Sequence, residues 1–217
     1  MCYKQWVTRM KEVLSQVEII GGEVAVLTIK EPAALHAIEK VEEELEIAIP
    51  FSYRKTLLEF SSHMEWRWYL PDEITLPEKF EYLLGSCGIL GVDHTLKCEN
   101  LRRELVAEIF NDPSHPYDII WHNKLAFFDV GNGDLLAFDL EQDKLDPPVI
   151  YLSHDDGETH GFILGENFID FMNKWSKIGF VGGDGWSLLP FIESQNGTIN
   201  PEGKNAQEWR GILGMGI

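Results

Sequence analysis

The residues best suited to catalysis or to metal binding lie in one polar stretch, residues 153–161. Its centre reads His-Asp-Asp-Gly-Glu-Thr-His and holds two imidazoles and three carboxylates within seven residues. Imidazole with carboxylate suits zinc or iron, whereas carboxylates alone suit calcium or magnesium. His154 and His160 are the possible ligands of a metal-dependent enzyme, but no HExxH-type helix accompanies them. Because Asp and Gly are also typical of turns, we interpret the stretch as an acidic turn with no metal and no cofactor.

A second set of carboxylates lies on or beside a predicted hairpin: Asp129, Asp134 and Asp139. Two neighbouring carboxylates can act as a general acid and a general base. No nucleophile or recognisable partner accompanies these residues, so we predict that Asp134 and Asp139 are hydrogen-bonding anchors for nearby backbone. We therefore expect no catalytic residue and no enzyme activity. Gly131-Asn132-Gly133 is not followed by a helix, so it lacks the helix N-terminus that a phosphate-binding loop needs.

The element that must position these residues is the hairpin itself, Leu125–Leu140. Asn132-Gly133 between two apolar runs predicts a type I′ turn, because both residues tolerate a positive φ. Centring the turn there places Val130 opposite Leu135, with the other expected pairs following in order: Phe128 with Ala137, Phe127 with Phe138, Asp129 with Leu136 and Ala126 with Asp139. Both faces of this hairpin are mostly apolar, so we expect it to be covered on both sides and central to its sheet.

The remaining elements follow from hydrophobic periodicity and from capping residues. Predicted helices cover residues 3–17, 31–48, 51–61 and 93–110, and a final helix starts after Asn167; predicted strands cover 64–70, 83–90, 119–121 and 147–152. Pro50 separates two of the helices, since the residue before a proline is pushed out of the α region. Phe168 and Trp175 belong to one apolar stripe of the final helix, which we interpret as core. Leu35 and Ile109 are expected on buried helix faces.

The charge is strongly negative, with 36 acidic against 18 basic side chains and a formal net charge of −18. Residues 121–160 alone hold nine acidic and two basic side chains. Such a field repels nucleic acid and anionic lipid and would attract a basic protein, although solubility alone could also explain it. The expected partner contacts are four acidic residues on loops of this region: Asp143, Asp155, Asp156 and Glu158. No apolar run could span a membrane, and the N-terminus lacks a secretory signal, so we expect a cytoplasmic protein.

Four short motifs, in this order, resemble the SUKH superfamily, which includes a yeast cell-wall-synthesis regulator and many bacterial immunity proteins. They are Glu44-Leu45-Glu46-Ile47-Ala48-Ile49-Pro50-Phe51-Ser52-Tyr53, Gly133-Asp134-Leu135-Leu136-Ala137-Phe138-Asp139, Pro148-Val149-Ile150-Tyr151 and Asn167-Phe168-Ile169-Asp170-Phe171. The resemblance implies an α+β fold, with a mixed or mainly antiparallel sheet of about six strands and helices packed against it. It also implies no shared catalytic machinery: bacterial members resemble antidotes to secreted toxins, often nucleases, and fungal members resemble scaffolds in cell-wall signalling.

These observations divide the chain into three segments. Residues 31–178 form the SUKH-like domain, residues 1–30 an accessory helix and strand, and residues 179–217 an extension packed on the same domain. The leading hypothesis is a non-enzymatic immunity protein that neutralises a basic, nuclease-type toxin. The alternatives are a regulatory scaffold in cell-wall or envelope signalling and a metal-dependent enzyme that uses the 154–160 loop.

Overall fold

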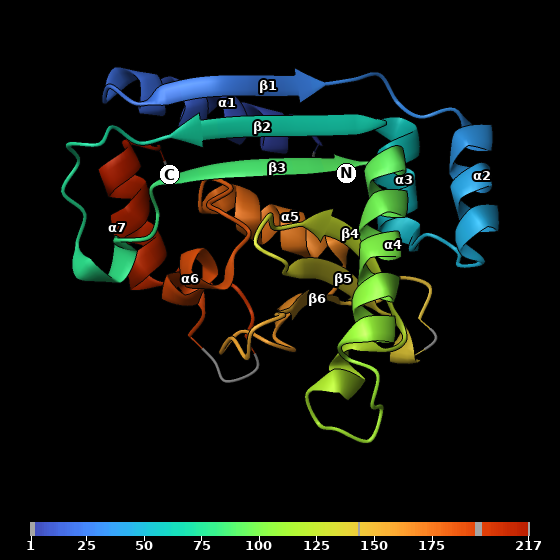
Figure 1. Ribbon diagram of the computed structural model, residues 1–217. Helices are drawn as coiled ribbons and strands as arrows, with labels where there is room; N and C mark the ends of the chain where they lie inside the picture. Colours follow the sequence, from blue (N-terminus) through green and yellow to red (C-terminus); the bar gives the residue numbers. More distant parts are fainter. Residues whose placement is uncertain (1–2, 143, 194–196, 217) are drawn as a thin grey trace.

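Two antiparallel sheets organise the computed structural model, which describes residues 3–142, 144–193 and 197–216 (Figure 1). The first sheet has the order β1-β2-β3, formed by Glu23–Ile29, His63–Tyr69 and Gly85–Gly91. The second has the order β4-β5-β6-β7, formed by Lys124–Asp129, Leu135–Asp139, Val149–Leu152 and Ile163–Gly165. The α-helices are α1 Tyr3–Ile19, α2 Leu35–Leu45, α3 Phe51–Glu59, α4 Val92–Glu108, α5 Phe168–Lys177, α6 Gly185–Leu188 and α7 Lys204–Leu213. Short 3₁₀ helices cover Glu78–Phe80, Asp118–Trp121, Leu140–Gln142 and Leu189–Phe191.

The α+β class and the antiparallel pairing are confirmed, but the strand count and the number of sheets are corrected. The described residues form seven strands in two sheets, where about six in one sheet were expected. Residues 119–121 form part of a 3₁₀ helix and not a strand. β7 was not predicted because three residues are too few to show a period-two pattern. Residues 1–30 supply α1 and also β1, which pairs with β2; the division of the chain into segments stays a prediction.

The first sheet is built on the alternation predicted for β2. Met64, Trp66 and Trp68 are buried, whereas Arg67 between them is exposed. Trp66 lies opposite Gly88 on β3, and a Cβ atom at Gly88 would lie 2.2 Å from the indole ring. Glycine at this position therefore leaves room for the Trp66 indole ring to lie over the neighbouring strand.

The hairpin in the second sheet is confirmed, but its predicted register is wrong. On the turn side Phe128 lies opposite Leu136 and not opposite Ala137, a shift of one residue that comes from the connection. A β-bulge between Ala126 and Phe128 adds a second shift, so that Ala126 lies opposite Ala137 and not opposite Asp139. Asp139 lies opposite Lys124 instead. The connection is also longer than a two-residue turn and covers residues 130–134. The extra residue of a bulge is not visible in an alternating pattern of apolar side chains, because it changes the register without changing composition.

The bulge decides which side chains enter which core. Phe127 and Phe128 both face the large apolar cluster, although strict alternation would place them on opposite faces. Ala126, Leu135 and Ala137 face a smaller cluster. Apolar side chains thus cover both faces of the hairpin as predicted, but β4 is an edge strand and only β5 is central.

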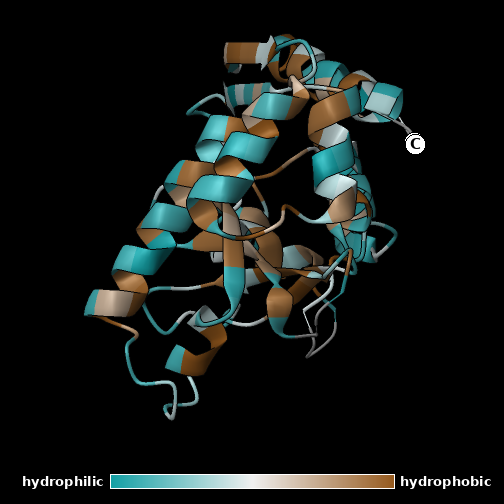
Figure 2. Cartoon of the chain, turned by 90° about the vertical axis from the view of Figure 1, so that its right-hand side faces the viewer, coloured by the Kyte–Doolittle hydropathy of each residue, from teal (hydrophilic) through white to brown (hydrophobic). Residues whose placement is uncertain are grey.

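The large cluster lies between the two sheets and includes side chains of α1, α5 and α7, whereas the small cluster lies between the second sheet and α4. Figure 2 shows the side of the molecule that carries α2 and α4, where hydrophilic and hydrophobic residues alternate along the helices. α1, α2, α3, α4 and α5 confirm the predicted helices, but Leu35 and Ile109, which were expected to be buried, are exposed. α5 is not the final helix, because α6 and α7 follow it. No helix among the described residues is long and apolar enough to cross a membrane.

Candidate binding surface

The hairpin connection ends in a buried carboxylate, Asp134, which is 4% exposed. Its Oδ1 accepts a hydrogen bond from the backbone N of His154 at 2.8 Å and lies 2.7 Å from the Nδ1 of the same residue. Its Oδ2 accepts from the Tyr151 hydroxyl and from Asn132 Nδ2. Gly133 has a φ of +105°, and a Cβ there would lie 3.0 Å from the His154 ring, so glycine fits both the turn and this close approach.

The electrostatics of Asp134 suit an anchor. Burial raises the pKa of Asp134, but the hydrogen bonds from Tyr151, His154 and Asn132 together lower it below its ordinary value. Burial, together with the bond to this carboxylate, raises the pKa of Tyr151 well above its ordinary value. Asp134 is therefore an ionised acceptor and Tyr151 a neutral donor at neutral pH.

The Tyr151 hydroxyl connects three segments of the chain. It donates to Asp134 in the hairpin connection and accepts a hydrogen bond from the backbone N of Gly185 at 2.8 Å. Gly185 begins α6, which Asp184 caps through a bond from Ser187 N. One buried hydroxyl thus fixes the hairpin and the start of α6 relative to each other.

The 153–161 loop that follows β6 is held by a second set of contacts. His160 Nδ1 accepts from the backbone N of Ser153 at 3.0 Å, and His160 Nε2 donates to the backbone O of Tyr117 at 3.0 Å. The rings of Tyr117 and His160 stack, with their centroids 3.8 Å apart. The Tyr117 hydroxyl donates to Ser153 O and accepts from Asp156 N. These contacts join both ends and the middle of the loop to the segment around Tyr117.

Three of the four predicted partner contacts are exposed on this loop: Asp155, Asp156 and Glu158. Asp155 also accepts a hydrogen bond from Ser153 Oγ at 2.9 Å. Asp156 has a φ of +61°, a conformation that Asp and Asn tolerate better than most residues. Asp143, the fourth predicted contact, lies outside the described residues.

An exposed aromatic pair adjoins the loop. Tyr82 and Trp186 are 60% and 65% exposed, and their ring centroids lie 5.6 Å apart. Trp186 is the second residue of α6, and a Cβ added to the preceding Gly185 would lie 2.6 Å from Thr159 Oγ1 in the loop. We call Asp155, Asp156, Glu158, Tyr82 and Trp186 the acidic–aromatic surface.

Sequence reasoning missed the aromatic half of this surface. Tyr82 and Trp186 are distant in the chain, and neither belongs to a periodic pattern. One signal was available: Trp186 follows a Gly-rich segment, residues 182–185, which has no apolar periodicity that would predict a buried tryptophan.

The same region contains the only three-residue group of metal-ligating type among the residues that the structure describes. Single ligand atoms of Asp134, His154 and Asp155 lie within 4.8 Å of one another. Both oxygens of Asp134 already accept hydrogen bonds, so a cation would have to displace them. Both ring nitrogens of His160 are used by Ser153 and Tyr117, so His154 and His160 do not converge as a ligand pair. The geometry therefore suits loop support better than metal binding.

The other residues predicted to be structural make core or anchoring contacts. Pro50 occupies the N-cap position of α3, and Asn167 Oδ1 caps α5 by accepting from Asp170 N. Phe168 packs against Tyr53, with ring centroids 4.5 Å apart, and Trp175 donates to the backbone O of Val181.

Asp139 forms a polar contact at the far end of the hairpin. Its Oδ1 lies 3.0 Å from the Nζ of Lys124, a side chain that is itself only 3% exposed. It also accepts from the backbone N of Glu141. These are contacts of the anchoring type expected for Asp139.

Beneath the hairpin lies a buried ionic cluster that the sequence did not reveal. Glu99 on α4 is fully buried and accepts from Arg102, Arg103 and the backbone N of Ala126 on β4. Arg102 also donates to the backbone O of Trp121 at 2.6 Å. A charged residue in an amphipathic helix ordinarily suggests a solvated face, so only the partners around Glu99 explain its burial.

Comparison with known proteins agrees with this architecture. Residues 32–174 match the sequence model of the SMI1 / KNR4 family (SUKH-1), which is about two thirds of the chain. A search of curated proteins found no significant match. The matched range contains the hairpin, β6 and the acidic loop, and it ends before α6 and Trp186.

Proposed function

The chain belongs to the SMI1/KNR4 family (SUKH-1), generally a family of protein-binding immunity or regulatory domains, and from this premise we propose that it is an immunity protein. It binds a basic, nuclease-type toxin domain through the acidic–aromatic surface and performs no reaction. The observation that supports this proposal most directly is an exposed aromatic pair beside an acidic loop that hydrogen bonds tie to the rest of the fold.

Each half of the surface has a distinct physical role. Exposed Trp and Tyr side chains are enriched among the residues that dominate binding energy in protein interfaces. Three exposed carboxylates in a chain of net charge −18 accelerate encounter with a basic partner and favour the correct orientation. The hydrogen bonds of Ser153, His160 and Asp134 reduce the conformational entropy that the loop would lose on binding.

The test uses co-expression and binding kinetics with a toxin encoded beside the gene. The chain should rescue growth of cells that express the toxin domain, and the purified proteins should associate rapidly at low salt. The variant D155N/D156N/E158Q should slow association about 10-fold at low salt, with the difference shrinking as salt screens the charges. W186A should weaken the complex about 10-fold or more, mainly through faster dissociation.

A control variant removes the same number of charges elsewhere. Glu39, Glu43 and Glu44 are exposed on α2, so E39Q/E43Q/E44Q matches the change in net charge and leaves the acidic loop intact. Equal slowing by the two triple variants would contradict a local acidic contact. Absence of rescue and of binding with every neighbouring toxin would contradict the immunity role.

A further inference from the structure

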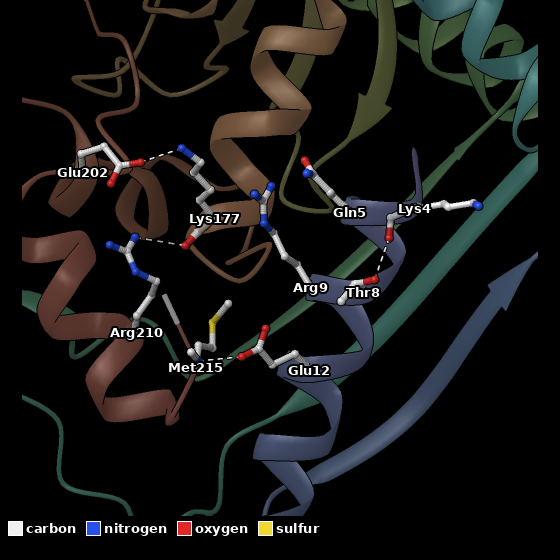
Figure 3. A pocket seen from close by; sticks show the side chains of 10 residues that line it. Lys4, Gln5, Thr8, Arg9, Glu12, Lys177, Glu202, Arg210 and Met215 are labelled. Atoms are coloured by element: carbon white, nitrogen blue, oxygen red, sulfur yellow. Dashed lines mark hydrogen bonds and ion pairs between the residues drawn. The ribbon is translucent and has the colours of Figure 1, made fainter. Parts of the chain in front are cut away.

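A concave site that includes none of the acidic–aromatic surface lies between α1, α5 and α7 (Figure 3). Its volume is about 540 Å³, which falls within the usual range for sites that hold small organic molecules. Every residue that lines it lies outside the range that matches the family, since they belong to residues 4–12, 177 and 202–216. No residue of the acidic–aromatic surface lines it, so the inference does not rest on the proposed toxin binding.

The lining is unusually cationic for an acidic protein. Three basic side chains from three helices, Arg9, Lys177 and Arg210, line it together with Glu12 and Glu202, whereas the side chain of Lys4 at its edge points away (Figure 3). Within residues 3–142, 144–193 and 197–216, no ion pair engages Arg9 or Arg210. In a chain with twice as many acidic as basic side chains, unpaired cations gathered at one cavity point to an anionic occupant.

The hydrogen bonds show which donors remain for a ligand. Arg210 is buried, and its Nη1 donates to the backbone oxygens of Pro201 and Lys177, so it mainly joins α7 to α5. Arg9 is half-buried and donates from Nη1 to Ser176 Oγ at 2.8 Å. The rest of its guanidinium can still form the paired hydrogen bonds that suit a carboxylate or a phosphate.

A carboxylate of the chain itself stands where an anion would approach. Glu202 is exposed and accepts from Lys177 Nζ at 2.6 Å. The hydrogen bond from Lys177, its charge and, more weakly, the charges of Arg210 and Arg9 lower the pKa of Glu202. An exposed ion pair of this kind is weak, so an incoming oxyanion could replace Glu202 at Lys177.

The floor of the site is less polar. Met215 is 7% exposed and lines the cavity, while Glu12 is engaged by the backbone N of Gly216 at 2.6 Å. A flexible thioether suits an apolar group of varied shape. We infer that this cavity binds a small organic anion, with its phosphate or carboxylate at Arg9 and Lys177 and its apolar part against Met215.

Isothermal titration calorimetry with the full chain and three probes tests this inference: adenosine monophosphate, hexanoate and inorganic phosphate. The expected result is saturable 1:1 binding of adenosine monophosphate, hexanoate or both, tighter than that of inorganic phosphate. Binding of the nucleotide alone assigns a phosphate group, and binding of hexanoate alone assigns a carboxylate. Absence of saturable binding by both organic probes, or no advantage over inorganic phosphate, overturns the inference.

Paired variants locate the site. R9M should weaken binding about 10- to 100-fold, whereas R67M removes one exposed arginine on β2 and should change it little. R9K keeps the positive charge but lacks the paired N–H donors of the guanidinium, so it should give an intermediate affinity. If R9M fails to fold, as judged by its circular dichroism, K177M gives the same comparison at the second cation of the cavity.

A variant at Glu202 should change the affinity in the opposite direction from R9M. E202Q should strengthen binding about two- to five-fold, because the ligand no longer competes for Lys177. E208Q is its control, since Glu208 lies on α7 and pairs with Lys79 at 2.6 Å outside the cavity. Equal effects of E202Q and E208Q, or of R9M and R67M, would show that only net charge matters and would overturn the site.

Discussion

A substitution of Asp134 tests whether this buried carboxylate supports the acidic–aromatic surface from beneath, without contacting a partner itself. Asp134→Asn is nearly isosteric, but one carboxylate oxygen becomes an NH₂ group that cannot accept. If the NH₂ group replaces Oδ2, Tyr151 and Asn132 lose their acceptor; if it replaces Oδ1, His154 N loses its acceptor. Either orientation therefore leaves at least one buried donor without a partner.

The magnitude follows from these contacts. A buried unsatisfied donor costs about 1–3 kcal/mol, and loss of a hydrogen bond to a charged group costs a similar amount, so we expect about 2–4 kcal/mol in total. In a chain of this length that lowers the melting temperature by roughly 5–15 °C. The matched control is Asp156→Asn, the same change at an exposed residue with a positive φ that Asn tolerates, and it should stay within about 0.5 kcal/mol of the parent.

The assay is urea unfolding of the parent and both variants at pH 7 and at pH 3. Because the pKa of folded Asp134 lies below its unfolded value of about 3.9, its stabilisation is fully present above pH 4 and is lost as pH falls through the folded pKa. The difference between parent and Asp134→Asn should therefore shrink toward acid pH. A difference at pH 7 no larger than that of Asp156→Asn, or one that does not depend on pH, would refute the assignment of Asp134 as a buried ionised anchor.

Three further predictions concern the elements that support the surface. Glu99→Gln leaves Arg102 buried beside a neutral side chain and should destabilise the fold by about 3–5 kcal/mol in thermal unfolding; a loss below 1 kcal/mol would show that the cluster is not effectively buried. Burial lowers the pKa of His160, so its neutral form is favoured in the fold, and as pH falls below about 6.5 the open form gains the proton first. The protection of the 153–161 amides, measured as their hydrogen-exchange rate relative to the intrinsic rate at the same pH, should therefore fall, whereas the variant His160→Gln should lose this pH dependence. Gly88→Ala places a Cβ 2.2 Å from the Trp66 ring and should cost about 1–3 kcal/mol with a changed tryptophan fluorescence, and an unchanged spectrum with unchanged stability would contradict this packing.

Local signals in the sequence predicted the elements that depend on local physics. Alternation at Met64, Trp66 and Trp68 gave β2, Pro50 marked the start of α3, and Asn167 capped α5 through Asp170. Each of these signals acts over a few residues, because capping, φ restriction and side-chain periodicity are set by near neighbours. The density of acidic residues between 121 and 160 is likewise a property of composition.

Tertiary structure decided everything that depended on which segments meet. The bulge at Phe127 moved Phe128 to the other face of the hairpin, and the partners of Glu99 made a charged helix position fully buried. Tyr82 and Trp186 became a surface pair, and α1, α5 and α7 came together to line the cationic cavity. Composition and periodicity do not encode such pairings, because they arise from packing and hydrogen bonding between residues that are distant in the sequence.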